Sequence, residues 1–116
     1  MKHRFDIYEL LAMVRLRPAM YIGTHSLVRL RAFVDGCFFM AREHGIESSE
    51  DPAFDDFHDW TAKRFGWSES TAGWGEIIVQ ECGGDEGSAL DRFFELIDEY
   101  CHPLEPAVEG ENGESD

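Results

Sequence analysis

The sequence predicts a single all-α domain of four to five short helices over residues 1–102, followed by a disordered acidic tail over residues 103–116. Three observations support this fold class. A chain of 116 residues has the length of one domain. Hydrophobic residues make up 43% of it and aromatic residues 13%, which is enough for one core. Apolar side chains recur at helical spacing in several segments that glycine or proline separates.

The first expected helix runs from about Asp6, which can act as its N-cap, to Leu16. Its apolar residues follow helical spacing at Ile7, Leu10, Leu11 and Val14. Pro18 ends this helix because the residue before a proline is disfavoured in the α conformation. Residues 20–22 should then form a short apolar connector that packs back onto the core, and Gly23 permits a turn.

A second, longer helix is expected from an N-cap at Thr24 or Ser26 to about His44, with Gly45 at its C-terminal end. One face of this helix is apolar and the other carries most of the charges. Residues 47–52 follow as an acidic, serine-rich loop.

Three further segments complete the expected fold. A third helix over about residues 53–65 carries an aromatic stripe that includes Phe54, Phe57 and Trp60. Residues 71–81 fit either a helix or a strand, and the spacing of the apolar residues favours a helix. Asp85 then caps a final helix that extends to about Tyr100.

The net charge of −14 is distributed unevenly along the chain. Residues 1–42 contain seven of the ten lysines and arginines and three acidic residues, a balance of +4, whereas residues 43–116 carry a balance of −18. A field of this sign repels nucleic acid and attracts basic partners. The same charge also serves ordinary solubility, so composition leaves both interpretations open.

No stretch is apolar over the roughly 18–20 residues that a helix needs to cross a bilayer. The polar N-terminus lacks the apolar core of a signal peptide. We therefore expect a cytoplasmic protein without membrane contact. The three cysteines, Cys37, Cys82 and Cys101, follow no metal-ligand spacing, and their odd number predicts reduced, buried thiols.

The most informative string lies between the first two expected helices and consists of Arg17, Pro18, Ala19, Met20, Tyr21, Ile22 and Gly23. Over about residues 8–36 the chain resembles the start of the ATPase domain of type II topoisomerases. In that family an Asn holds Mg²⁺ at the position that Gly36 occupies here. The acidic segment 83–87 does not suit a phosphate loop. We therefore expect a structural role for the string, no ATPase activity and no cofactor.

A second resemblance covers about residues 8–101. The order of the Arg-Pro-x-Met-Tyr-Ile-Gly string, a helix with Leu-Arg-Ala-Phe-Val-Asp-Gly, a Phe/Trp helix, a Trp-x-x-Ile-Ile segment and an Ala-Leu-Asp-x-Phe-Phe-Glu helix is similar to a group of small, mostly uncharacterised bacterial proteins. Some proteins of this style belong to toxin–immunity systems. The resemblance implies an immunity protein.

Aromatic and acidic residues occur together in the centre of the chain and form the candidate site. Its expected partner-binding residues are Asp55, Asp56, Asp59, Trp67, Glu69 and Glu76. Aromatic rings can anchor a partner while carboxylates steer and pair with it. Trp60 and Trp74 also suit the core, whereas Trp67 lies in an expected loop and should be partly exposed.

The functional prediction is a non-enzymatic binding protein, most specifically an immunity protein that neutralises a basic toxin without direct contact to nucleic acid. One alternative is a nucleic-acid mimic that inhibits or regulates a DNA-binding enzyme. Another is a small hydrolase or metal enzyme that uses His58 with neighbouring aspartates. A solvated helix face explains those residues as well, and no catalytic or metal-binding residue is predicted. The sequence leaves the oligomeric state open.

Overall fold

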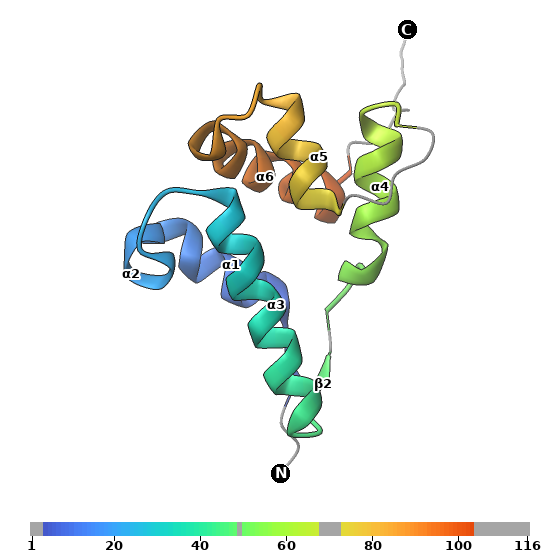
Figure 1. Cartoon of the computed structure of the whole chain (residues 1–116). Helices are drawn as coiled ribbons and strands as arrows, with labels where there is room; N and C mark the ends of the chain where they lie inside the picture. Colours follow the sequence, from blue (N-terminus) through green and yellow to red (C-terminus); the bar gives the residue numbers. More distant parts are fainter. Residues whose placement is uncertain (1–3, 49, 68–72, 104–116) are drawn as a thin grey trace, which may run out of the picture.

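The computed structural model describes residues 4–48, 50–67 and 73–103, and six α-helices account for most of them (Figure 1). In chain order the elements are β1 (Arg4–Phe5), α1 (Ile7–Leu16), α2 (Pro18–Ile22), α3 (Leu27–Glu43), β2 (Glu47–Ser48), the 3₁₀ helix η1 (Phe54–Asp56), α4 (Phe57–Arg64), α5 (Trp74–Glu81) and α6 (Glu86–Cys101). The predicted all-α class is confirmed. The expected helix in the ambiguous segment 71–81 is confirmed as α5.

Three helices begin at the capping residues that the sequence predicted. The carboxylate of Asp6 accepts a hydrogen bond from the backbone N of Tyr8 at 2.9 Å. The hydroxyl of Ser26 accepts from the backbone N of Arg29 at 3.3 Å. At α6, the Asp85 carboxylate accepts from the N of Gly87 at 3.1 Å. Each cap satisfies a backbone donor that has no partner inside the helix, so each fixes where its helix starts.

The expected connector at residues 20–22 is wrong, because these residues belong to the short helix α2. Pro18 occupies the first position of α2, where its fixed φ suits the helix and no backbone donor is lost. Helical geometry points Ile22 into the core, where it is 6% exposed, and leaves Met20 69% exposed. Met20 therefore does not pack back onto the core. Gly23 ends α2 with φ of +83°, a conformation that favours glycine.

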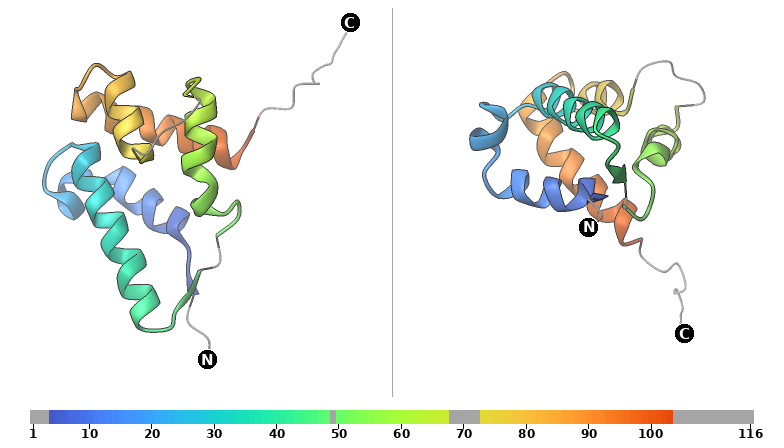
Figure 2. Two further views of the ribbon diagram at one scale, coloured as in Figure 1. Left: turned by 45° about the vertical axis from the view of Figure 1, so that its right-hand side comes forward. Right: turned by 90° about the horizontal axis from the view of Figure 1, so that it is seen from below.

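The expected loop at residues 47–52 begins with a strand that the sequence did not reveal. Arg4 and Phe5 pair in parallel with Glu47 and Ser48, which ties the N-terminal segment to the residues after α3. Figure 2 shows this pair beside the C-terminal end of α3, close to the N-terminus of the chain. Two-residue strands carry almost no periodic signal, so the pairing depends on tertiary context.

The core is built around the ring of Phe57, which is fully buried. Five aromatic rings have centroids between 5.3 and 5.7 Å from it: Phe54, Trp60, Trp74, Phe93 and Tyr100. These rings come from η1, α4, α5 and α6, so Phe57 joins four elements. Trp74 is 7% exposed and is a core residue.

Helices α5 and α6 pack against each other, and we call this pair the α5–α6 base. Both α3 and α4 pack against α5 and against α6. In Figures 1 and 2, α3 and α4 diverge from each other, and the segment that carries β2 connects their lower ends. Within the described ranges, no helix combines the length and apolar character that crossing a membrane requires. The expected tail, from residue 104 onward, and Glu69 lie outside the described residues.

The exposure of neighbouring residues in α2 gives a test of its helical register. Ile22→Ala removes a buried side chain and should lower the free energy of unfolding by about 3 kcal/mol. Met20→Ala, the matched control on the opposite side, should change it by less than about 0.5 kcal/mol. Chemical denaturation measures both. Equal losses for the two variants would show that α2 does not have this register.

Candidate partner-binding site

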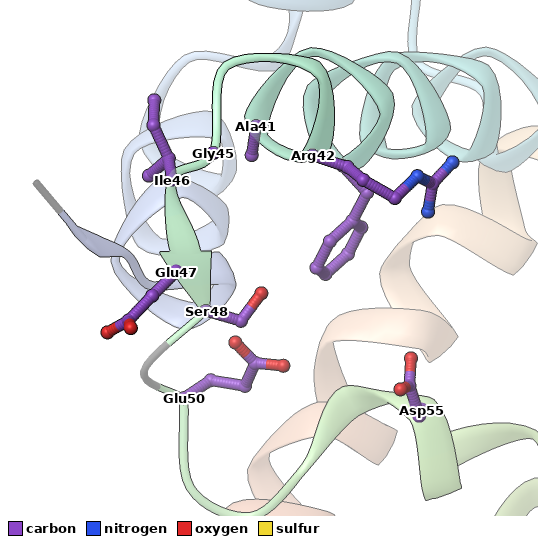
Figure 3. A pocket seen from close by; sticks show the side chains of 9 residues that line it. Ala41, Arg42, Gly45, Ile46, Glu47, Ser48, Glu50 and Asp55 are labelled. Atoms are coloured by element: carbon purple, nitrogen blue, oxygen red, sulfur yellow. The ribbon is translucent and has the colours of Figure 1, made fainter.

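A pocket of about 440 Å³ opens between the C-terminal end of α3, β2 and η1 (Figure 3). We call it the acidic pocket, and its lining residues are Phe38, Ala41, Arg42, Gly45, Ile46, Glu47, Ser48, Glu50 and Asp55. Figure 3 shows the side chains of Ser48, Glu50 and Asp55 directed toward the same space, whereas that of Glu47 points away from it and that of Arg42 extends along its edge. Two carboxylates and a hydroxyl therefore converge on one opening.

Glu50 is the least exposed of the acidic residues that line this pocket. Its Oε2 accepts a hydrogen bond from the backbone N of Phe54 at 3.5 Å. Its Oε1 is buried and has no hydrogen-bond donor among the residues that the structure describes. A buried carboxylate oxygen without a donor is costly, so it attracts any group that can donate to it.

Two tyrosines fix the segment between Glu50 and Asp55. The hydroxyl of Tyr8 donates to the carbonyl oxygen of Pro52 at 2.5 Å, and the hydroxyl of Tyr100 donates to that of Ala53 at 2.6 Å. Burial raises the pKa of both tyrosines above the usual range, and nearby acidic groups add to the shift. Both hydroxyls therefore keep their protons and remain donors, which holds the acidic segment against α1 and α6.

The aromatic floor of the pocket continues into the core. Phe38 of α3 lines the pocket and stacks on Phe54 with centroids 5.9 Å apart. Phe54 in turn stacks on Phe57 at 5.4 Å. The pocket thus has a rigid apolar wall on one side and carboxylates on the other.

The structure places the predicted aspartates on η1 and the start of α4. Asp55 lines the acidic pocket, Asp56 precedes α4, and Asp59 lies in the first turn of α4. All three are exposed and form no ion pair with the residues that the structure describes. Acids on α6 differ, because Asp98 pairs with Arg15 and Glu99 pairs with Arg64, each at 2.9 Å.

The remaining predicted residues lie elsewhere. Trp67 is partly exposed, and its Nε1 donates to a carboxylate oxygen of Glu81 at 2.9 Å, which ties the end of the α4 turn to α5. Glu76 is exposed in the first turn of α5 and accepts from Gln80 at 2.9 Å. Neither Trp67 nor Glu76 is among the described residues that line the acidic pocket.

Other candidate chemistries find less support in the geometry. Within the described ranges, no group of three or more His, Cys, Asp or Glu side chains is arranged to hold a metal ion. His58 has a buried Nδ1 without a partner in the described part of the chain. The three cysteines are free and partly buried, and burial raises the pKa of each thiol. Their protonated form is the less nucleophilic one.

Sequence reasoning identified one member of the pocket, Asp55, and missed Glu50, Ser48 and Phe38. The signal for Glu50 and Ser48 is the acidic, serine-rich composition of residues 47–52, which by itself predicts only a loop. Their convergence with Asp55 depends on the tyrosine hydrogen bonds, which composition does not reveal.

Comparison of the chain with protein-family models, with curated proteins and with solved structures found no match. The resemblances to topoisomerases and to toxin–immunity proteins therefore stay predictions.

Proposed function

We propose that this protein is a non-enzymatic binding protein whose acidic pocket receives a lysine or arginine side chain of a basic protein partner. The observation that carries the proposal is that the side chains of Glu50 and Asp55 are directed toward the same space, and that the buried Oε1 of Glu50 lacks a donor in the described residues. A guanidinium or ammonium group supplies several donors and a positive charge together.

The walls of the pocket suit the rest of such a side chain. Lysine and arginine carry apolar stems that pack along apolar surface while the charged end meets its partner. Phe38, Ala41 and Ile46 provide that surface at the pocket. The pocket volume of about 440 Å³ lies within the range usual for specific binding sites.

The surrounding charge favours encounter with a basic surface. Asp56 and Asp59 follow the pocket residue Asp55 directly along η1 and α4, and all three are exposed without an ion pair in the described part of the chain. Exposed carboxylates that are not neutralised act mainly on the association rate, at distances up to about 10 Å at ordinary salt. The net charge of −14 has the same sign.

Within this class, the resemblance to toxin–immunity proteins favours a toxin as the partner, so that the chain acts as its immunity protein. A basic protein that copurifies with this chain should stop growth when it is expressed alone in a host strain. Co-expression of the present chain should restore growth. Normal growth in the absence of this chain would remove the toxin from the proposal and leave the binding function untouched.

The pocket can be tested without the natural partner. N-acetyl-arginine amide should shift the backbone amide signals of Ser48, Glu50 and Asp55 in an NMR titration, with a dissociation constant of about 1 mM or weaker for so small a ligand. The isosteric N-acetyl-citrulline amide, which lacks the charge, should produce no saturable shift.

Matched variants separate the pocket from the overall charge. Glu50→Gln with Asp55→Asn should weaken the arginine-amide response at least about tenfold, because it removes both carboxylates. Glu9→Gln with Asp91→Asn removes the same charge from exposed positions on α1 and α6 and should leave it unchanged. If citrulline binds as well as arginine, or if both variants behave alike, the pocket is not a cation site.

A further inference from the structure

The outer face of α3 is apolar although it faces solvent. Val28, Phe39 and Met40 are each 52% exposed, and Ala32 and Gly36 between them are exposed as well. A hollow of about 570 Å³ lies along this face, with Phe33, Gly36 and Met40 among its lining residues. Large contiguous apolar surface is unusual on a monomer and marks an interaction site. The face lies on the side of α3 away from Leu30 and Val34, which are in the core.

The pattern of residues along this face is symmetric about Gly36. Arg29 and Glu43 each lie seven residues from Gly36, which is close to two helical turns, so the three positions are nearly in line along the helix. A small residue, Ala32, lies four positions before Gly36, and a large one, Met40, lies four positions after it.

We propose that this face binds a second copy of the chain, with the two α3 helices packed antiparallel and crossing at Gly36. In that arrangement Arg29 lies opposite Glu43 of the partner subunit, and this pair occurs twice by symmetry. Met40 comes over Ala32 of the partner subunit, so a large side chain meets a small one. Gly36 allows the two helices to approach each other closely at the crossing, since nothing in its own chain lies within 4 Å of the position that a Cβ would occupy there.

Charge complementarity favours this occupant over another kind of partner. Arg29 and Glu43 are both exposed, and neither has an ion pair in the described part of the chain. A purely acidic or purely basic partner would satisfy one of them and repel the other. An antiparallel copy satisfies both at once. The acidic pocket shares Ala41 and Ile46 with this hollow, but its carboxylates come from β2, η1 and the segment between them, not from the face of α3 that carries Gly36.

The test measures the mass of the full-length protein by sedimentation from low-micromolar to near-millimolar concentration. The wild-type chain should dimerise as concentration rises. Arg29→Glu alone and Glu43→Arg alone should each weaken the dimer about tenfold, because each creates two like-charge contacts. The double variant should recover it. Residues 29 and 43 are about 21 Å apart along one helix, so recovery can only come from contact between copies.

Gly36→Glu provides an independent variant with an intact fold. The position is open, and glutamate favours helix more than glycine does, so the monomer should be no less stable in a denaturation experiment. Two carboxylates would meet at the crossing point, and the dimer should be lost. A wild-type chain that stays monomeric throughout, a dimer that Gly36→Glu leaves intact, or a double variant that does not recover would each overturn the proposal.

Discussion

The stacked rings of Phe54 and Phe57, with centroids 5.4 Å apart, connect almost every helix of this protein. Phe54 also contacts rings of α1, α3 and α5 through Tyr8, Phe38 and Trp74. Phe57 extends the cluster to α6. Because α3 and α4 diverge and meet mainly through this stack and the α5–α6 base, the stack sets how the end of α3 faces the start of α4. A small domain depends on a few large rings in this way.

The acidic pocket follows from that arrangement. The backbone N of Phe54 donates to Glu50, and the ring of Phe54 packs on Phe38 at the pocket wall. The same residue thus orients a carboxylate and builds the apolar surface beside it. Arg15 and Arg64 pair with acids on α6, whereas Asp55, Asp56 and Asp59 form no ion pair with the residues that the structure describes, so the negative charge where η1 and α4 begin is not neutralised in this way. Packing and charge segregation together produce a surface suited to a cation.

The fold class, three helix caps and the helix at residues 74–81 could be predicted because local signals decide them: a capping side chain, a glycine or a 3.6-residue period. Three features could not be predicted from local signals. The β1–β2 pair joins residues more than 40 positions apart, and the segment that lines the pocket is held by Tyr8 and Tyr100, which are 44 and 47 positions from their partners. Helix α2 is too short for periodicity to distinguish it from a loop. Of the site, Asp55 was foreseen from its acidic surroundings. The buried oxygen of Glu50 depends on tertiary contacts from Tyr8, which no local pattern encodes.

The most direct measurement of the central claim is the association rate of a basic partner with two charge-matched variants at low and high salt. Asp55→Lys with Asp59→Lys should slow association by about tenfold at low salt and much less at high salt, because exposed charges steer encounter and salt screens them. Glu9→Lys with Asp91→Lys changes the net charge equally, away from the pocket, and should have a clearly smaller effect. Equal rates for the two variants would contradict a localised acidic site. They would show that only the net charge of the chain affects association.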